Sequence, residues 1–269
     1  MNYLKRTIRY LKLHLGNPRY LFTYAINYFN PNFIPDIKYY ELDELEDVLR
    51  AGKSLVRIGD GEVYIMNNGN IGYQKFEPKL KEVFFKIISE YDESSSCVIG
   101  LNKTPISKSN STLRKDKLLN CWMPMKSFYE IYFNKKAKYF DATLFYYNET
   151  FPEYFEAFLK TRHLVLVTRQ HSIEKFKANK SIPFSDVSFV ETPENNAFDQ
   201  YDQIKKEVLD EVARHGKSKT IVLAAFGPAS KLLVYELAKE GVVSIDVGRG
   251  IEVAYTDERI DHIIYPDLN

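Results

Sequence analysis

Short apolar runs alternate with longer amphipathic runs along most of this chain, and that alternation constrains its fold more than any other feature. The strongest run, 219–225, is the kind of apolar segment that a buried strand of a parallel sheet requires. Comparable strands are predicted at 54–58, 96–101, 163–168, 187–190 and 242–247, and helices at 41–51, 78–91, 112–134, from 172, 197–215 and 228–240. Because strands that alternate with helices form βαβ units, we predict an α/β fold with a Rossmann-like, mostly parallel sheet flanked by helices.

The composition limits the class of protein. A length of 269 residues with 45% hydrophobic side chains supplies a sizeable core. We divide the chain into an N-terminal helical segment, 1–40, and a single α/β domain, 41–269. The net charge of +1 argues against a general nucleic-acid-binding protein, which usually carries a marked basic excess. Cys97 and Cys121 fit neither a zinc spacing nor a disulfide framework, which favours a reducing, cytoplasmic setting.

The N-terminal segment is basic, and two interpretations of it stay open. Its apolar stretches are far shorter than the roughly 20 residues that a bilayer requires, and too interrupted for a secretory signal. We expect it to pack on its own domain with its charges in water. The alternative is a helix lying on an anionic membrane, as a peripheral contact with the inner face. Its bases are Lys5, Arg6, Arg9, Lys12 and Arg19.

Two carboxylates follow the first core strand. Asp60 and Glu62 alternate with glycines after Arg57 and Ile58, and the sequence predicts a flexible turn there. Mg²⁺ commonly binds through one or two carboxylates together with substrate phosphates, so this pair is a candidate cation site. The plainer interpretation is a polar turn whose acids cap a helix. Arg57 would pair with these acids, contact a ligand or form a structural ion pair.

Two further strand ends carry candidate binding residues, because parallel sheets bind ligands beyond the carboxyl ends of their strands. After 219–225, Gly227 gives a tight turn and Pro228 suits the first helical position, so the free amides of the next turn favour phosphate. An ordinary strand–helix turn is the alternative. Asn196 follows another strand and is predicted to be a helix N-cap.

The last predicted strand ends at Asp246, and a glycine-rich turn then leads to Glu252. Both acids are candidates for a general base. Glu252 lies on a loop at the same sheet edge as the other candidates. Asp246 is still within the strand, where a buried structural acid is the expected occupant.

Taken together and in order, these motifs resemble those of the bacterial GT-D-fold glycosyltransferases, a family long catalogued as a domain of unknown function. The resemblance runs from about residue 45 to 260. It is carried by Asp60-Gly61-Glu62, Pro193-Glu194-Asn195-Asn196-Ala197-Phe198-Asp199-Gln200-Tyr201, Gly227-Pro228-Ala229-Ser230-Lys231 and Asp246-Val247-Gly248.

The resemblance implies a GT-D type of fold and transfer of a sugar, with glucose as one candidate, from a UDP-sugar to a glycan or glycoprotein acceptor. It implies that Asp60 and Glu62 bind Mn²⁺ or Mg²⁺ at the donor diphosphate. The remaining donor-site residues would be Arg57, Gly59, Asn196, Gly227, Pro228, Ala229 and Ser230. Glu252 would be the base, with Asp246 as its rival.

Two other functions remain open from the sequence. One is a different α/β enzyme, a metal-dependent phosphohydrolase or nucleotidyltransferase, that uses the same acids and helix start. The other is a non-catalytic module that binds a nucleotide or a glycan without turnover.

Overall fold

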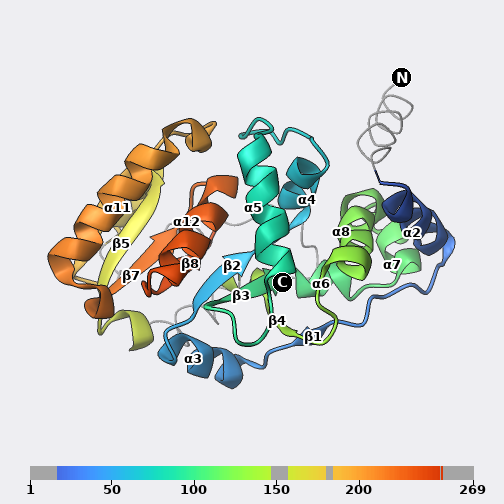
Figure 1. The fold of residues 1–269 in the computed structure, drawn as a ribbon, viewed down its shortest axis with the longest axis horizontal. Coiled ribbons are helices and arrows are strands. Elements are labelled where there is room, and N and C mark those ends of the chain that lie inside the picture. Colours follow the sequence, from blue (N-terminus) through green and yellow to red (C-terminus); the bar gives the residue numbers. More distant parts are fainter. Residues whose placement is uncertain (1–16, 147–156, 180–183, 249, 251–269) are drawn as a thin grey trace.

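The computed structural model describes residues 17–146, 157–179, 184–248 and 250. Its centre is an eight-stranded sheet in the order β1-β4-β3-β2-β8-β7-β5-β6 (Figure 1). Every pairing in the sheet is parallel. The strands are β1 Lys38–Tyr39, β2 Ser54–Arg57, β3 Cys97–Leu101, β4 Lys138–Asp141, β5 His163–Arg169, β6 Val187–Thr192, β7 Thr220–Ala224 and β8 Ser244–Asp246. The predicted α/β fold with a parallel sheet is therefore confirmed.

Helices cover the sheet, and the chain alternates between the two kinds of element as predicted. In Figure 1, α11, α12 and α5 lie in front of the sheet, while α2, α7 and α8 gather at the β1–β4 side. The α-helices of the described residues are α2 Pro18–Phe29, α3 Leu42–Arg50, α4 Asp60–Met66, α5 Pro78–Ser89, α6 Lys103–Ile106, α7 Asn110–Lys115, α8 Leu119–Tyr132, α10 Gln170–Ala178, α11 Tyr201–His215 and α12 Pro228–Lys239. Short 3₁₀ turns are η1 Ala142–Tyr146, η2 Ala197–Gln200 and η3 Lys217–Lys219.

The middle of the sheet is apolar on both faces. Strands β2, β7 and β8 are buried along almost their whole length. Between β2 and β8, the Ser54 hydroxyl donates to the Val242 carbonyl at 3.2 Å and accepts from the Ser244 amide at 3.0 Å. A strand enclosed in this way must satisfy its polar groups internally, which these serines do.

The first half departs from the prediction at two places. The stretch 102–110, for which no helix or strand is predicted, contains α6, and Asn110 is buried because its side chain donates to the carbonyls of Asn27 and Asn30. The predicted helix 112–134 is divided into α7 and α8 by a turn at Lys117, whose φ is +61°. Strands β1 and β4 were also missed; β1 has only two residues, and β4 has four, of which two are charged.

A buried lysine joins three parts of this half. The Lys126 ammonium on α8 donates to the carbonyls of Phe33 and Lys108 and to the Asn110 side chain, at 2.5–3.2 Å. Burial lowers the pKa of Lys126 to about 8. This lysine therefore holds the chain that leads into β1 against α6 and α7.

The N-terminal part of the description begins at α2, which packs on α8. The Tyr20 ring lies 5.1 Å from that of Phe128, and its hydroxyl donates to the Pro124 carbonyl at 3.4 Å. The division into a segment 1–40 and a domain 41–269 stays a prediction. Within the described ranges, no helix is long and apolar enough to cross a membrane.

Candidate functional site

Charged side chains meet at the carboxyl ends of β2 and β8, the two central strands. Asp60 and Glu62 follow β2, Asp246 ends β8, and Lys231 reaches them from the first turns of α12. Because these strands are neighbours in the sheet, residues almost 190 positions apart share one edge. We call Arg57, Asp60, Glu62, Lys231 and Asp246 the charged cluster.

The prediction of a flexible turn at Asp60 and Glu62 is wrong. Both residues lie in the first turn of α4. The Glu62 Oε2 atom accepts a hydrogen bond from the Gly59 amide at 2.9 Å, which satisfies one of the free donors at the helix start. A carboxylate here also interacts favourably with the helix dipole. The plainer interpretation, a helix-capping acid, is thus correct for Glu62.

Lys231 neutralises two of the three acids. Its Nζ atom lies 3.3 Å from Glu62 Oε1 and 3.1 Å from Asp246 Oδ2, and all three side chains are buried. Burial alone would lower the pKa of Lys231, but the carboxylates of Asp246 and Glu62 outweigh it and raise that pKa. The lysine is therefore held as a cation between the two acids.

Arg57 is the second cation of the charged cluster. Its Nε atom lies 3.4 Å from Asp246 Oδ2. Gly248 makes room for it, because a Cβ there would lie 1.8 Å from an Arg57 guanidinium nitrogen. Gly248 also has a φ of +51°, which few side chains tolerate. The structure thus places Arg57 against Asp246.

Asp60 differs from the other two acids. Across the described ranges, no lysine, arginine or histidine forms an ion pair with it. Its carboxylate accepts hydrogen bonds from backbone amides at the start of α4 and contacts Cys121 on α8, whose Sγ atom lies 3.5 Å from Asp60 Oδ2. Burial, and then the charge of Glu62, raises the pKa of Asp60. When ionised, this acid therefore has no balancing cation among the described residues.

A hard divalent cation fits this donor set. Both oxygens of Glu62 are engaged, one by Lys231 and one by the Gly59 amide, whereas the donors to Asp60 are the weak thiol of Cys121 and backbone amides, none of them a cation. Asp60 would be the direct ligand, and Glu62 would need to release a partner or act through water.

The loop that carries Tyr73, the loop that carries Asn196 and the start of α12 lie side by side. They include three of the predicted donor-site residues, Asn196, Gly227 and Pro228. The Asn196 amide donates to the Tyr73 carbonyl at 2.8 Å, and its side-chain oxygen accepts from the Lys75 amide at 2.9 Å. Asn196 does stand at the N-cap position of η2, as predicted, but its backbone is left-handed and its side chain bonds to this other loop instead of capping the helix. Pro228 does begin α12, as predicted, after Gly227.

The glycine and serine of this turn have partners within the protein. A Cβ on Gly227 would lie 2.9 Å from the Tyr73 ring, which covers it. The Ser230 hydroxyl donates to the Gly227 carbonyl at 2.6 Å and accepts from the Phe226 amide at 3.2 Å. Ser230 and Ala229 are fully buried, and the Ser230 amide already donates to the Gly227 carbonyl at 3.1 Å, so neither side chain faces a ligand. Gly59 is likewise enclosed, with Asn102 3.3 Å from a Cβ position.

Sequence reasoning missed three residues of this region. Lys231 stands within the quoted motif, four residues after Gly227, and a lysine among apolar helix positions was the available signal. Tyr73 is 51% exposed beside Gly227, but it lies in an irregular loop with no periodicity. Cys121 reaches Asp60 only through the packing of α8. Glu252, the predicted base, lies outside the described residues.

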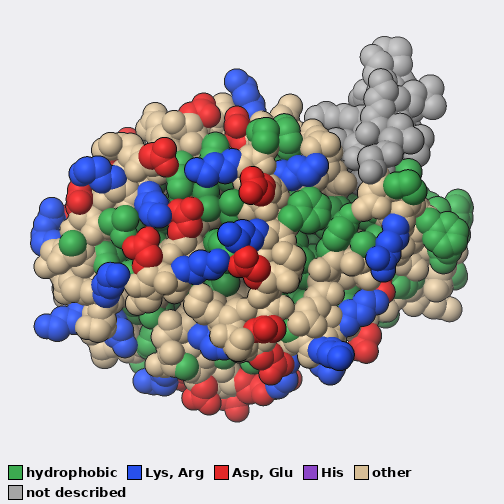
Figure 2. Space-filling model, in the orientation of Figure 1, with side chains coloured by type: hydrophobic (Ala, Val, Ile, Leu, Met, Phe, Trp, Pro, Cys, Tyr) green, Lys and Arg blue, Asp and Glu red, His purple; other side chains and the backbone are tan. Residues whose placement is uncertain are grey.

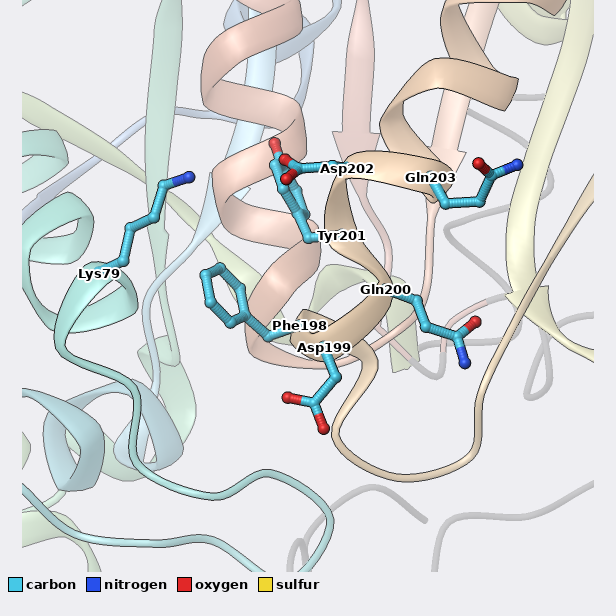
Figure 3. A pocket seen from close by; sticks show the side chains of 7 residues that line it. All are labelled: Lys79, Phe198, Asp199, Gln200, Tyr201, Asp202 and Gln203. Carbon is cyan, nitrogen blue, oxygen red and sulfur yellow. The ribbon is translucent and has the colours of Figure 1, made fainter.

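A hollow of about 420 Å³ lies next to this region, lined by Lys79, Phe198, Asp199, Gln200, Tyr201, Asp202 and Gln203 (Figure 3). Lys79 extends from α5 toward the stacked rings of Phe198 and Tyr201, with its Nζ atom 6.0 Å from each centroid. The hollow includes none of the charged cluster. Most of its lining residues come just after Asn196 in the chain, so the hollow borders the same edge of the sheet.

The opposite, amino edge holds a second polar group. His163, Asp186 and His215 offer ligand atoms that all lie within 4.8 Å of one another. The two imidazole rings, however, are stacked. Their centroids lie 3.4 Å apart and their planes are within 4° of parallel, so their in-plane lone pairs do not converge on one point. His163 already bonds to Asp186 at 2.6 Å and to Ser188 at 2.9 Å.

Comparison with known proteins agrees with the resemblance seen in the motifs. The sequence profile of the family described as glycosyltransferase GT-D fold matches residues 55–257. A probable glycosyl transferase, Gly, of Streptococcus gordonii is 23% identical over 229 residues, which cover 76% of this chain. The chain spans only 30% of the length of that relative.

Solved structures share the fold at low sequence identity. A glycosyltransferase of the DUF1792 group from Streptococcus sanguinis aligns with a TM-score of 0.65 at 23% identity, covering 81% of this chain and 83% of that one. A DUF1792 structure reported to have a distinct glycosyltransferase fold gives a TM-score of 0.66 at 21% identity, over 87% of this chain and 83% of its own.

Proposed function

The chain belongs to the GT-D-fold glycosyltransferase family, and from that membership we propose that it transfers a sugar from a UDP-sugar to a glycan or glycoprotein acceptor, with a divalent cation at the donor diphosphate. Two free cysteines in the described residues agree with the cytoplasmic setting that we propose for this reaction. Glucose is our first candidate for the sugar.

The observation that carries the proposal is that Asp60 has no cation partner among the described residues. Glu62 and Asp246 each have a cation within 3.4 Å, whereas Asp60, in the same edge of the sheet, has none among the described residues. A fold that keeps such a carboxylate in partly buried surroundings loses stability by doing so, which is typical of functional sites. Bound Mn²⁺ or Mg²⁺ would balance Asp60 and neutralise charge that develops on the leaving diphosphate.

The donor would lie over the start of α12. The backbone amides of its first turn favour a diphosphate. Tyr73, half exposed beside Gly227, would offer a ring face to the uracil of the donor. Asn196 fixes the loop that carries Tyr73. Lys231 lies close behind and keeps the charges of Glu62 and Asp246 from opposing the diphosphate. Arg57 would act from behind Asp246, by holding that carboxylate in place.

For the general base we keep Glu252 as the first candidate. Asp246 is fully buried and faces two cations, so it is placed to orient Lys231 and Arg57. A base must come within hydrogen-bond reach of the acceptor hydroxyl, and a side chain with no exposed surface is poorly placed for that. The hollow beside Phe198 and Tyr201 is our candidate acceptor site, since its aromatic faces and two carboxylates suit a sugar.

The test is turnover of UDP-sugars with and without Mn²⁺ or Mg²⁺, following intact donor, free UDP and inorganic phosphate. Transfer or slow hydrolysis that releases UDP supports the proposal. Release of phosphate would favour a phosphohydrolase, and intact donor after long incubation a binding module.

The decisive variant is Asp60→Asn, with Asp43→Asn as its control, because Asp43 occupies the first turn of another helix, α3. Since interactions of a catalytic cation are worth several kcal/mol, we expect Asp60→Asn to lower cation-dependent turnover on the order of a hundredfold or more. Asp43→Asn should retain full activity. Full activity of folded Asp60→Asn at limiting Mn²⁺ would remove Asp60 from the site.

A further inference from the structure

Helix α2 turns its apolar residues toward solvent. Phe22, Ile26 and Phe29 are 69%, 54% and 79% exposed, and their spacing puts them on one face. The opposite face, which packs on the protein, carries the polar-tipped Tyr20 and its neighbours. A surface helix normally has the reverse arrangement. Figure 2 shows hydrophobic side chains over this edge of the molecule, where Figure 1 places α2.

The same part of the chain has an unusual charge. Five of the 37 Lys and Arg lie in residues 1–35, whereas none of the 36 Asp and Glu does. The rest of the chain therefore carries a net negative charge. The positive charge is concentrated in the segment that contains the exposed apolar face.

Neighbouring elements extend the basic surroundings. Arg114 on α7 donates from Nη2 to the Tyr28 carbonyl at 3.1 Å and lies over the Tyr28 ring. Arg114, Lys115 and Lys117 are all exposed. The acid among them, Asp116, is paired with Lys108 at 3.3 Å. Bases thus border the apolar face of α2 at its C-terminal end, and Arg19 does so at its start.

We propose that α2 docks this enzyme on an anionic lipid surface, with Phe22, Ile26 and Phe29 entering the boundary between headgroups and acyl chains. A second copy of the chain would bring two basic surfaces together, which is unfavourable. An anionic membrane meets both features at once, since it accepts an apolar aromatic face and attracts the surrounding bases. An exposed apolar patch rimmed by charge is typical of such contacts.

The docking face is one helix away from the charged cluster. Tyr20 of α2 packs on α8, and Cys121 of α8 contacts Asp60. Docking through α2 would therefore hold the charged cluster at a fixed distance from the lipid surface. The inference concerns where the enzyme lies, and it does not depend on the identity of the donor.

The experiment is flotation of the full chain with vesicles of phosphatidylcholine alone, or with about 30% phosphatidylglycerol, at low and high salt. We expect binding to the anionic vesicles only, weakened by salt. Phe22→Ser/Phe29→Ser should lower the vesicle partition coefficient at least about tenfold. Arg19→Gln should weaken binding severalfold, whereas Lys206→Gln, on the distant and exposed side of α11, should not.

Circular dichroism must show that each variant is folded. Absence of wild-type binding to anionic vesicles would overturn the proposal, as would equal binding by the double variant. A dimer in light scattering that the double variant converts to monomer, without vesicle binding, would assign the face to a second copy instead.

Discussion

The two edges of the central sheet carry similar residue types but treat them differently. At the amino edge, His163 has a partner on each ring nitrogen, and one of those partners, Asp186, has a side chain that is 67% exposed. At the carboxyl edge, Glu62, Lys231 and Asp246 are buried, and Asp60 has no cation partner among the described residues. The buried histidine at the first edge is satisfied locally, in part by an acid that faces water, whereas at the second edge the buried ion pairs leave Asp60 without a cation among the described residues.

That difference supports our proposal that the carboxyl edge holds the functional site. A buried, incompletely balanced charge lowers stability, so its presence needs a reason beyond folding. The amino edge needs none, because its hydrogen bonds explain its residues. Each of the following experiments tests one part of this contrast.

Lys231→Met should give the largest effect. It leaves Glu62 and one side of Asp246 buried without their cation, so we expect a loss of roughly 3–5 kcal/mol in the free energy of unfolding. Lys239→Met is the matched control, since Lys239 and its partner Glu90 are about half exposed. That pair should contribute at most about 1 kcal/mol. Urea denaturation measures both, and equal losses would mean that the charged cluster is no more costly to disturb than a surface pair.

Gly248→Ala tests the position of Arg57. The new methyl group would lie 1.8 Å from an Arg57 nitrogen and must displace the guanidinium from Asp246. Gly241→Ala is the control, because Gly241 also has a positive φ, +77°, but no atom within 4 Å of its Cβ position. Both variants should lose about 1–2 kcal/mol of stability from backbone strain. Only Gly248→Ala should weaken donor binding in calorimetry, by about tenfold or 1.4 kcal/mol.

Asp60→Asn should also change stability, and with a definite dependence on pH. The pKa of Asp60 is raised in the folded state by burial and by Glu62, so the folded protein binds its proton more tightly than the unfolded chain does. The stability of the wild type therefore falls as pH rises from about 4, the usual pKa of aspartate, through the raised value. At pH 7 the variant should be more stable by roughly 0.5–2 kcal/mol. This advantage should shrink toward pH 4. An advantage that stays constant with pH would mean that the pKa of Asp60 is not raised in the folded protein.

His215→Gln should have the smallest effect. It removes one ring of the stack at the amino edge while His163 keeps both of its hydrogen bonds. We expect a change within about 0.5 kcal/mol in unfolding and about twofold in kcat and donor KM. A large loss of turnover would mean that the amino edge contributes to the reaction.

Periodicity predicted most of the fold but only part of the site. Long strands such as β5 and β7 and helices such as α5 and α12 have apolar patterns that depend only on their own residues. By contrast, β1 pairs with β4 over two residues, which leaves no periodic signal. The stretch 102–110 is polar in sequence, yet Asn110 is buried by partners some 80 residues away.

The site shows the same limit. Asp60 and Glu62 were recognisable because two acids follow a strand, but their different surroundings depend on Lys231 and Cys121, which other helices supply. Asn196 was correctly placed at the start of a helical turn, but its side chain does not cap that turn, since it bonds to the Lys75 amide of another loop. Local sequence names the acids, and tertiary packing decides which of them is left unbalanced.

The position of β8 has a consequence for synthesis of the protein. This strand, one of the last elements described, lies between β2 and β7 and completes the pairing of both. While the chain is still emerging from the ribosome, β2 and β7 therefore each present an open apolar edge, a surface prone to join another chain. Any product that terminates before residue 244 lacks Asp246 and the strand that brings the two halves of the sheet together. Such a fragment would be inert as an enzyme and a substrate for chaperones.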